Sequence, residues 1–260
     1  MARPERPKVK NHLKKMIREG QLVIGTELAL SHPDTAEALG RLGYDWIMID
    51  TEHAPLDPGT VQVLLQAMSA SKSVPIARVT WNDMVLIKRL LDIGLYGIIV
   101  PWVNTKEEAT YAVRAMRYPP QGVRGFGPRR AGMLDPDYVK TANKELFLGV
   151  QIETQRAVDN IDEILSVEGV DAALVGPADL SLSMGILGQF DHPRFIAALK
   201  KVIDSCNAHG VTPGMLGTDD VGKRARMGFR MFCRMNDLGF ISVEGKRVLE
   251  ESREAVASIR

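Results

Sequence analysis

The chain alternates short apolar runs with longer segments in which apolar residues recur every three or four positions. The short runs are rich in β-branched and aromatic residues and are bounded by glycine, proline or polar residues, a pattern typical of buried strands. The last two runs show this pattern most weakly. The eight predicted strands lie at residues 22–26, 44–49, 74–79, 96–100, 146–152, 172–175, 211–215 and 230–235.

Segments with helical periodicity follow most of these runs. A lead-in helix is expected at residues 10–19, and a final helix at 243–258 closes the chain. One internal helix is predicted to begin at Asn82, a residue type that caps helix N-termini, and to run to Leu91. The other predicted helices lie at residues 34–42, 58–69, 106–116, 154–165 and 193–208.

Strand and helix alternate eight times within 260 residues. This favours parallel βαβ units closed into a (β/α)₈ TIM barrel, and we expect one domain over residues 1–260. The alternative is an open, doubly wound sheet, which would carry a glycine-rich dinucleotide-binding loop after its first strand. No such loop follows that strand, and Gly125-Phe126-Gly127 follows a predicted helix instead.

One connection, residues 117–145, is much longer than the others. Connections of that length inside compact domains often serve as active-site lids or as contacts between subunits. Its basic residues Arg124, Arg129 and Arg130 leave two interpretations open. In the first, they bind an anion and have a role at the active site or in a contact between subunits. In the second, they form a solvated basic surface.

Composition and charge narrow the class of protein. Hydrophobic residues make up 45% of the chain, and the net charge of +1 with scattered basic residues argues against a nucleic-acid-binding surface. The two cysteines, Cys206 and Cys233, have neither metal-binding nor disulfide spacing, which indicates a reducing compartment. The sequence shows no secretory signal and no apolar run of membrane-spanning length. We expect a cytoplasmic protein with a small soluble ligand and no nucleic-acid or membrane partner.

Polar groups follow the apolar runs where a barrel would place catalytic residues, at the carboxyl ends of its strands. Each of these groups alone also suits a helix cap or a turn, which is the usual role of an acid at such a position. Their convergence on one rim favours an active site. The candidates are Glu27 after the first strand, Asp50 and His53 after the second, Arg78 at the end of the third, Glu153 after the fifth and Asp179 beyond the sixth.

The imidazole of His53 titrates near neutral pH, so a general base is the functional interpretation and a surface histidine is the alternative. Glu153 and Asp179 offer hard oxygen ligands from neighbouring strands, which select Mg²⁺ or Mn²⁺ with several retained waters. The alternative makes Glu153 an acid in the first turn of a helix and Asp179 a turn cap.

The guanidinium of Arg78 follows a buried apolar run and needs an anion. A substrate carboxylate bound through two hydrogen bonds would satisfy it. The alternative is a structural salt bridge to Glu27, Asp50 or Glu52. We interpret Glu52 itself as structural.

These groups together suit an α-keto acid. A divalent ion stabilises the enolate that develops as a carbon–carbon bond breaks, Arg78 binds the carboxylate, and His53 takes the proton of the hydroxyl that becomes an aldehyde. An aldolase that forms a Schiff base would need a desolvated lysine at a strand end. All lysines fall in predicted helices, loops or termini, so that mechanism is disfavoured.

The same residues lie in motifs that resemble those of the class II, pyruvate-dependent aldolases of the 4-hydroxy-2-oxoheptanedioate aldolase family, also called 2-keto-3-deoxy acid aldolases, within the aldolase/citrate lyase superfamily. Several independent motifs agree in order and spacing, and the resemblance covers about residues 25–214. The motifs are Asp45 to Pro55, Arg78 with Trp81-Asn82-Asp83, Arg117 to Gly125, Gln151-Ile152-Glu153-Thr154, and Val167 to Asp171 with Gly176-Pro177-Ala178-Asp179-Leu180-Ser181.

The resemblance implies a barrel whose last helix packs on a neighbouring subunit, in a hexamer built as a trimer of dimers. It implies Glu153 and Asp179 as ligands of Mg²⁺ or Mn²⁺, with Co²⁺ a further candidate, Arg78 on the pyruvyl carboxylate and His53 as acid and base. Four more roles follow from it. Gln151 and the backbone of Gly176, Pro177 and Ala178 bind the keto acid, Asp50 holds a metal-bound water, and Asp92 orients His53, including across a subunit interface.

The expected activity is the reversible cleavage of a 4-hydroxy-2-oxo acid to pyruvate and an aldehyde. Past Gly214 the motifs depart from the family pattern, which leaves the aldehyde open. Two alternatives remain. One is another enolate chemistry on the same scaffold, either a citrate-lyase-like cleavage of an acyl-CoA or a decarboxylating condensation. The other is a non-catalytic, oligomeric keto-acid-binding protein, against which the presence of His53 argues.

Overall fold

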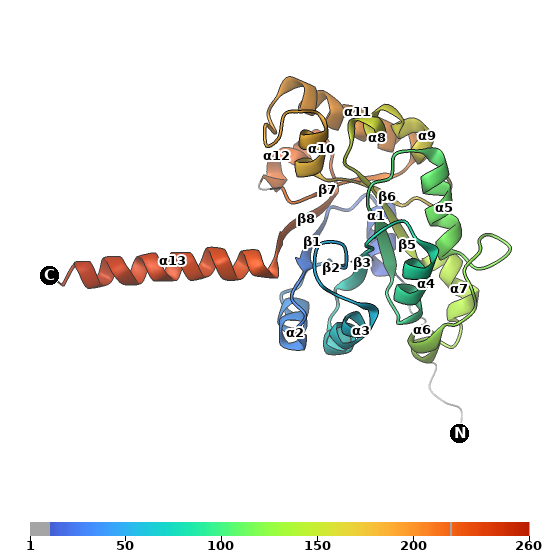
Figure 1. Ribbon diagram of the computed structural model, residues 1–260, viewed down its shortest axis with the longest axis horizontal. Coiled ribbons are helices and arrows are strands. Elements are labelled where there is room, and N and C mark those ends of the chain that lie inside the picture. The colour runs from blue at the N-terminus through green and yellow to red at the C-terminus, as the bar shows by residue number, and fades with distance from the viewer. Residues whose placement is uncertain (1–10, 219, 260) are drawn as a thin grey trace.

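Eight parallel strands close into a barrel in the order of the chain (Figure 1). The computed structural model describes residues 11–218 and 220–259. Each strand pairs with the next, and the eighth pairs with the first, which confirms the predicted barrel and both of the weakest strands. The strands are β1 (Val23–Leu28), β2 (Trp46–Asp50), β3 (Val74–Arg78), β4 (Gly97–Val100), β5 (Phe147–Ile152), β6 (Ala172–Val175), β7 (Thr212–Leu216) and β8 (Met231–Asn236).

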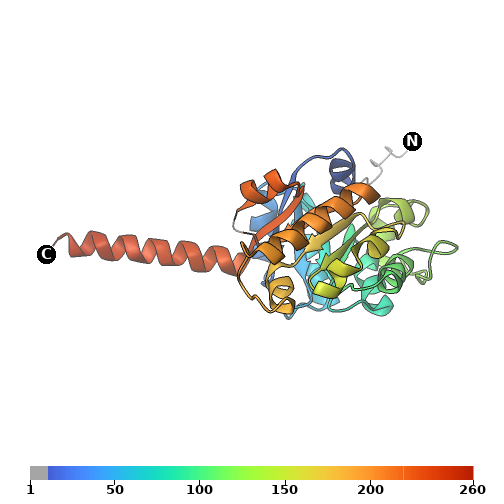
Figure 2. The ribbon, with the colours of Figure 1, turned by 90° about the horizontal axis from the view of Figure 1, so that it is seen from above.

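Helices surround the barrel, except for the last one, which extends away from it (Figures 1 and 2). They are α1 (His12–Arg18), α2 (Pro33–Arg41), α3 (Pro58–Ala67), the short 3₁₀ helix η1 (Met68–Ala70), α4 (Met84–Asp92), α5 (Lys106–Met116), α6 (Arg129–Leu134), α7 (Tyr138–Glu145), α8 (Gln155–Asp159), α9 (Ile161–Leu165), α10 (Pro177–Ser183), α11 (Pro193–His209), α12 (Val221–Met227) and α13 (Asp237–Ala257). The predicted first residue of the lead-in helix, Lys10, lies outside the described residues.

Several predicted boundaries were wrong. Asp83 caps α4 in place of Asn82, because its carboxylate accepts from the backbone N–H groups of the first turn. The predicted helix at 154–165 divides at Asn160 into α8 and α9. The last helix begins at Asp237, directly after β8. The long connection contains two helices, α6 and α7, and Glu27 lies within β1 because that strand runs on to Leu28.

Side chains alternate between the interior of the barrel and the layer beneath the helices, as the two-residue period of a strand requires. Trp46 and Met48 of β2 belong to the interior cluster, whereas Ile47 and Ile49 pack in the outer layer. The interior is so closely packed that a Cβ atom on Gly25 would overlap the indole of Trp46. Interior side chains of the other strands are Val23, Val74, Ile76, Ile99, Phe147, Ala172, Leu174, Leu216, Met231 and Cys233.

Helix α1 closes the N-terminal end of the barrel. Its apolar residues Leu13 and Ile17 join the interior cluster. Lys14 lies between them on the chain and is buried, with its ammonium 3.0 Å from Asp171 and donating to the Leu146 carbonyl at 2.7 Å. Helix α1 therefore closes this end of the barrel interior.

Helix α13 projects away from the barrel instead of packing against it (Figures 1 and 2). Its starting direction is fixed by Asp237, a buried carboxylate that accepts from the N–H groups of Ala29 and Leu30. The helix carries the exposed apolar residues Leu238, Ile241, Val243, Val248, Leu249 and Val256. None of the helices within residues 11–218 and 220–259 is long and apolar enough to cross a bilayer.

Candidate active site

The candidate residues continue the inward-facing rows of the strands beyond the apolar interior. On β2 the row Trp46, Met48 ends in Asp50, and on β3 the row Val74, Ile76 ends in Arg78. On β5 the row continues through Gln151 to Glu153. Because side chains two residues apart share one face of a strand, the sequence places these polar groups as the last inward layer. That layer lies at the C-terminal rim, where barrels carry their sites.

Asp50 and Arg78 form a buried ion pair. They are partners in the β2–β3 register, and Arg78 donates from Nε and Nη2 to the two oxygens of Asp50 at 2.9 Å each. Burial opposes the charge on Asp50, but the hydrogen bonds from Arg78 outweigh it and hold the pKa of Asp50 below its usual value. Burial would likewise lower the pKa of Arg78, and its bonds to Asp50 raise it. Both groups are therefore charged in the absence of substrate.

Glu52 is a second acid on Arg78, so the structure contains the salt bridges to Asp50 and Glu52 that the sequence offered as the alternative for this arginine. What sequence reasoning missed is that Glu52 also adjoins His53. Its Oε2 lies 3.2 Å from Arg78 Nε and 3.7 Å from His53 Nε2. This oxygen is buried and makes no hydrogen bond. Burial raises the pKa of Glu52 to about 7, against the attraction of Arg78. The available signal was its position beside His53, two residues beyond the end of an inward row.

His53 stands on the loop after β2 with its side chain 69% exposed. The loop is anchored by Asp50 Oδ1, which accepts from the N–H groups of Glu52 and His53 at 3.0 and 3.4 Å. The imidazole thus reaches solvent at the rim from a fixed backbone. Its nearest acid in this subunit is Glu52, so the predicted base and the arginine share one neighbour.

Glu153 is buried just beyond β5, and both of its oxygens are engaged. Oε1 accepts from the Trp102 N–H at 2.6 Å, and Oε2 accepts from Gln151 Nε2. Burial raises the pKa of Glu153 to about 7, the Trp102 amide acts in the opposite direction, and the nearby charges of Glu52 and Asp179 raise it further. Glu52 and Asp179 therefore lie close enough to Glu153 for their charges to affect its ionisation.

The acid set fits a divalent cation. Asp179 lies in the first turn of α10, and its negative charge raises the pKa values of Glu153 and Glu52. No group of three or more His, Cys, Asp or Glu residues in the described part of the chain has the geometry of a complete metal site. Mg²⁺ needs only one or two protein carboxylates, with waters and substrate oxygens completing its shell. Two buried acceptors, Gln151 Oε1 and Glu52 Oε2, accept no hydrogen bond, which also suits a site that binds a further group.

Gly176 gives this site its space. A Cβ atom there would lie 3.0 Å from Glu153 Oε2 and 3.1 Å from Gln151 Nε2. Pro177 and Ala178 follow it in the first turn of α10, which has no side-chain cap. The structure therefore brings the predicted substrate-binding residues together with the predicted metal ligands.

Asp92 lies elsewhere. It is the last residue of α4, and a helix of such a barrel runs back from the C-terminal rim to the N-terminal end. Its carboxylate pairs at 2.7 Å with Arg124, a buried arginine whose guanidinium also lies 4.5 Å from the Tyr118 ring centroid. Contact between Asp92 and His53 within one subunit is excluded by this placement. An orienting role across an interface stays a prediction.

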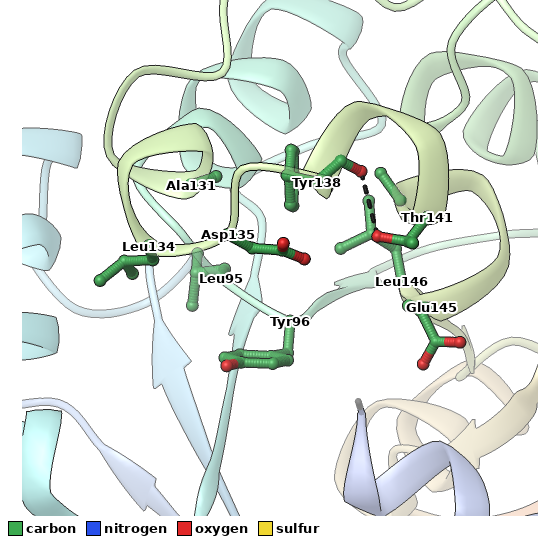
Figure 3. Close-up of a pocket in the computed structure, with 10 residues that line it drawn as sticks. Leu95, Tyr96, Ala131, Leu134, Asp135, Tyr138, Thr141, Glu145 and Leu146 are labelled. Carbon is green, nitrogen blue, oxygen red and sulfur yellow. Dashed lines mark hydrogen bonds between the residues drawn. The ribbon is translucent and has the colours of Figure 1, made fainter. Parts of the chain in front are cut away.

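The long connection lies at the N-terminal end of the barrel, away from the rim of its own subunit. Helices α6 and α7 cover a pocket of about 40 Å³ (Figure 3). Leu95 and Tyr96, which precede β4, and Leu146, which precedes β5, form its floor. This small, largely apolar pocket is separate from the candidate active site, and of the two functional interpretations of the connection only a subunit contact suits this position.

Comparison with known proteins gives one consistent result. Residues 25–231 match the model of the HpcH/HpaI aldolase/citrate lyase family. The matched segment extends past Gly214 into β8. The 5-keto-4-deoxy-D-glucarate aldolase of Shigella boydii is 43% identical over 221 residues, 84% of this chain and 86% of the relative. The protein of the same name from Escherichia coli (strain K12 / DH10B) is 43% identical over 217 residues, 82% and 85% of the two chains.

Solved structures agree with these relatives. A family protein from Burkholderia cenocepacia J2315 superposes with a TM-score of 0.88 at 36% identity, covering 94% of this chain and 99% of that chain. The citrate synthase SbnG superposes with a TM-score of 0.85 at 32% identity, covering 94% and 98%. Sequence and fold lead to the same conclusion: this chain belongs to the HpcH/HpaI aldolase/citrate lyase family.

Proposed function

We propose that this protein is a carbon–carbon lyase, a divalent-metal-dependent aldolase that reversibly cleaves a 4-hydroxy-2-oxo (2-keto-3-deoxy) acid to pyruvate and an aldehyde. The observation that carries the proposal is the convergence of an acid pair, an arginine and a histidine on one barrel rim. The 43% identity to 5-keto-4-deoxy-D-glucarate aldolases over most of the chain supports this chemistry.

Glu153 and Asp179 would hold the cation, for which Mg²⁺ and Mn²⁺ are the first candidates and Co²⁺ the next. When bound, such an ion supplies Lewis-acid stabilisation of the charge that develops on the keto oxygen. Asp50, the last residue of β2 on the same rim, would hold a water of the ion's shell. Gln151, with a free buried acceptor, and the start of α10 at Gly176 would orient the keto acid.

Arg78 would bind the substrate carboxylate. It is already paired with Asp50 and Glu52, so the substrate shares the guanidinium with two acids. This arrangement keeps Arg78 ordered before binding, because its Nε and Nη2 are held in place. A carboxylate enters a site whose positive charge is preorganised.

His53 would take the proton of the C4 hydroxyl, directly or through a water. The oxygen then forms the aldehyde carbonyl, the C3–C4 bond breaks, and its electron pair passes to the pyruvate fragment as an enolate. Protonation at C3 completes pyruvate. The exposed position of His53 on the rim suits this exchange of protons with solvent.

The test is metal-dependent release of pyruvate from a 2-keto-3-deoxy acid. We expect Glu153→Ala and Asp179→Ala each to lower kcat/KM by at least about 100-fold, because removing a ligand removes the stabilisation of the developing negative charge. Glu168→Ala, at an exposed acid of the N-terminal end, serves as the control. Full activity after EDTA treatment and gel filtration would exclude the metal-dependent mechanism.

A second candidate reaction is supported by the citrate synthase at 32% identity. This reaction would be a condensation that also proceeds through an enolate. It belongs with the two alternatives that the sequence left open, the cleavage of an acyl-CoA and a decarboxylating condensation. The higher identity of the aldolases makes cleavage the first choice. Assays of pyruvate with a panel of aldehydes, run beside assays of citrate formation, separate the two reactions and identify the aldehyde.

We also propose a cytoplasmic hexamer, arranged as a trimer of dimers, in which α13 packs on a neighbouring subunit. The projecting helix with its row of exposed apolar residues supports this assembly. A neighbouring subunit is also the only source of an Asp92 that orients His53.

A further inference from the structure

Trp102, just beyond β4, has a backbone conformation that large residues rarely adopt. Its φ is 57°, and it is the only non-glycine residue with a positive φ among residues 11–218 and 220–259. Such a conformation persists only where the surroundings enforce it, and it occurs often at functional sites. The consequence here is visible in one contact. The strained turn directs the Trp102 N–H at Glu153 Oε1, 2.6 Å away.

Asn104 enforces this turn. It is 5% exposed, and its Nδ2 donates to the Trp102 carbonyl at 2.8 Å. Its own N–H donates to Glu108 Oε2 at 2.6 Å, and its carbonyl accepts from Asn160 Nδ2 at 2.9 Å. The backbone N–H, the backbone carbonyl and Nδ2 of Asn104 are therefore all hydrogen-bonded, which leaves its Oδ1 to consider.

The Oδ1 atom of Asn104 contacts the residue that follows Glu153 in the chain. Asn104 Oδ1 accepts from the hydroxyl of Thr154, the residue that directly follows Glu153. Thr154 in turn caps α8, where its Oγ1 accepts from the Ala157 N–H at 3.0 Å. The side chain of Asn104 thus ties the turn after β4 to the end of β5, with one hydrogen bond to each segment.

We propose that Asn104 is a positioning residue for Glu153. It holds the Trp102 amide on Oε1 and the Glu153 backbone in place through Thr154, so that the remaining lone pairs of the carboxylate face the cation. This inference rests on the proposed function, because it takes Glu153 as a metal ligand. Residues that orient metal ligands in this way affect affinity for the metal by about 10- to 100-fold when they are removed.

The test measures the affinity for Mn²⁺ by electron paramagnetic resonance on the purified full-length protein. The variants are Asn104→Ala, which removes both side-chain contacts, and Asn104→Asp, which keeps the acceptor for Thr154 and loses the donor to Trp102. Asn82→Ala is the matched control, because Asn82 makes a similar bond from Nδ2 to the Glu108 carbonyl at 2.9 Å but has no hydrogen bond to Trp102, Glu153 or Thr154.

We expect Asn104→Ala to raise the Kd for Mn²⁺ by about 10- to 100-fold, Asn104→Asp to raise it less, and Asn82→Ala to leave it within about twofold. Lost aldolase activity of the Asn104 variants should return at saturating Mn²⁺, which general damage to the rim would not allow. An unchanged Kd in a folded Asn104→Ala protein overturns the inference. If that variant does not fold, an unchanged Kd in Asn104→Asp overturns it instead. Failure of the wild-type protein to bind Mn²⁺ overturns the proposed metal site itself, and this inference with it.

Discussion

Arg78 shows how one side chain serves both stability and binding. Its guanidinium neutralises Asp50 and lies beside Glu52, and all three are largely withdrawn from water. A buried acid that loses its partner is costly, because the charge remains in a medium that solvates it poorly. Substitution of this arginine therefore affects folding as well as affinity for substrate.

We predict that Arg78→Ala lowers the free energy of unfolding by about 3–5 kcal/mol, as expected for breaking a buried ion pair. Urea denaturation followed by circular dichroism measures this change. The double variant Arg78→Ala with Asp50→Asn removes the orphaned charge and should recover part of the loss. Equal stability of the wild-type protein and Arg78→Ala would contradict the ion pair as a structural element.

Substitution of Glu52 should have the opposite effect on stability from substitution of Arg78. Its pKa of about 7 in the folded protein lies above the ordinary value of 4.5, so the folded state favours the protonated form. Its contribution to stability is present below pH 4.5 and is lost as the pH rises through about 7.

Glu52→Gln should therefore stabilise the metal-free protein at pH 8 by about 1–2 kcal/mol and have little effect at pH 4.5. Thermal unfolding at the two pH values measures the difference. Glu168→Gln, at an exposed acid, should show no such dependence on pH. If the two variants behave alike, the burial of Glu52 does not perturb its ionisation.

At the scale of elements, α1 acts as the closure of the barrel. Leu13 and Ile17 fill the interior, and Lys14 between them is buried against Asp171. Burial lowers the pKa of Lys14 and raises the pKa of Asp171, and their mutual attraction opposes both effects. The pair therefore depends on both partners being present.

Lys14→Met should cost about 3–5 kcal/mol of unfolding free energy, because Asp171 is then left buried without its partner. The neighbouring Lys15 provides the control, since its side chain is 71% exposed and its ion pair with Glu19 is 3.7 Å long. Lys15→Met should change the unfolding free energy by less than about 0.5 kcal/mol. Chemical denaturation of both variants at one pH makes the comparison, and similar losses in both would refute the closure by Lys14.

Whole-molecule organisation depends on α13. Helix α13, 21 residues long, is anchored to its own subunit at its start by Asp237, and it projects from the barrel with exposed apolar residues along its length. We expect Leu249→Asp to dissociate the proposed hexamer into smaller species, because a carboxylate would be buried in the contact. Glu250→Asp, one residue further, keeps a charged side chain and should leave the assembly unchanged.

Light scattering coupled to size-exclusion chromatography measures the mass of each species. A wild-type protein that is monomeric at micromolar concentration, or a Leu249→Asp protein of wild-type mass, would contradict the proposed packing of α13 on a neighbouring subunit. Aldolase activity measured on the same fractions tests whether the neighbouring subunit contributes to the site.

Sequence alone determined the barrel and most of its rim. Strand and helix periodicities are local properties, so the eight repeats were readable, and the two-residue period already placed Asp50, Arg78 and Glu153 at strand ends. The predicted helix boundaries were wrong where two neighbouring residues both suit a helix cap, as Asn82 and Asp83 do. Choosing between them depends on the side-chain packing of the neighbouring helix, which Asn82 contacts.

Only the tertiary structure decided how these groups pair. It assigned Arg78 to Asp50 and Glu52, brought Glu52 into the site, and placed Asp92 at the opposite end of the barrel. It also showed that Trp102 and Asn104, from a turn about 50 residues away in the chain, form hydrogen bonds with Glu153 and Thr154. Such contacts depend on which side chains the closed barrel brings together and on how deeply it buries them. A local pattern records the order of residues along the chain, whereas the closure of the barrel sets the distances between them.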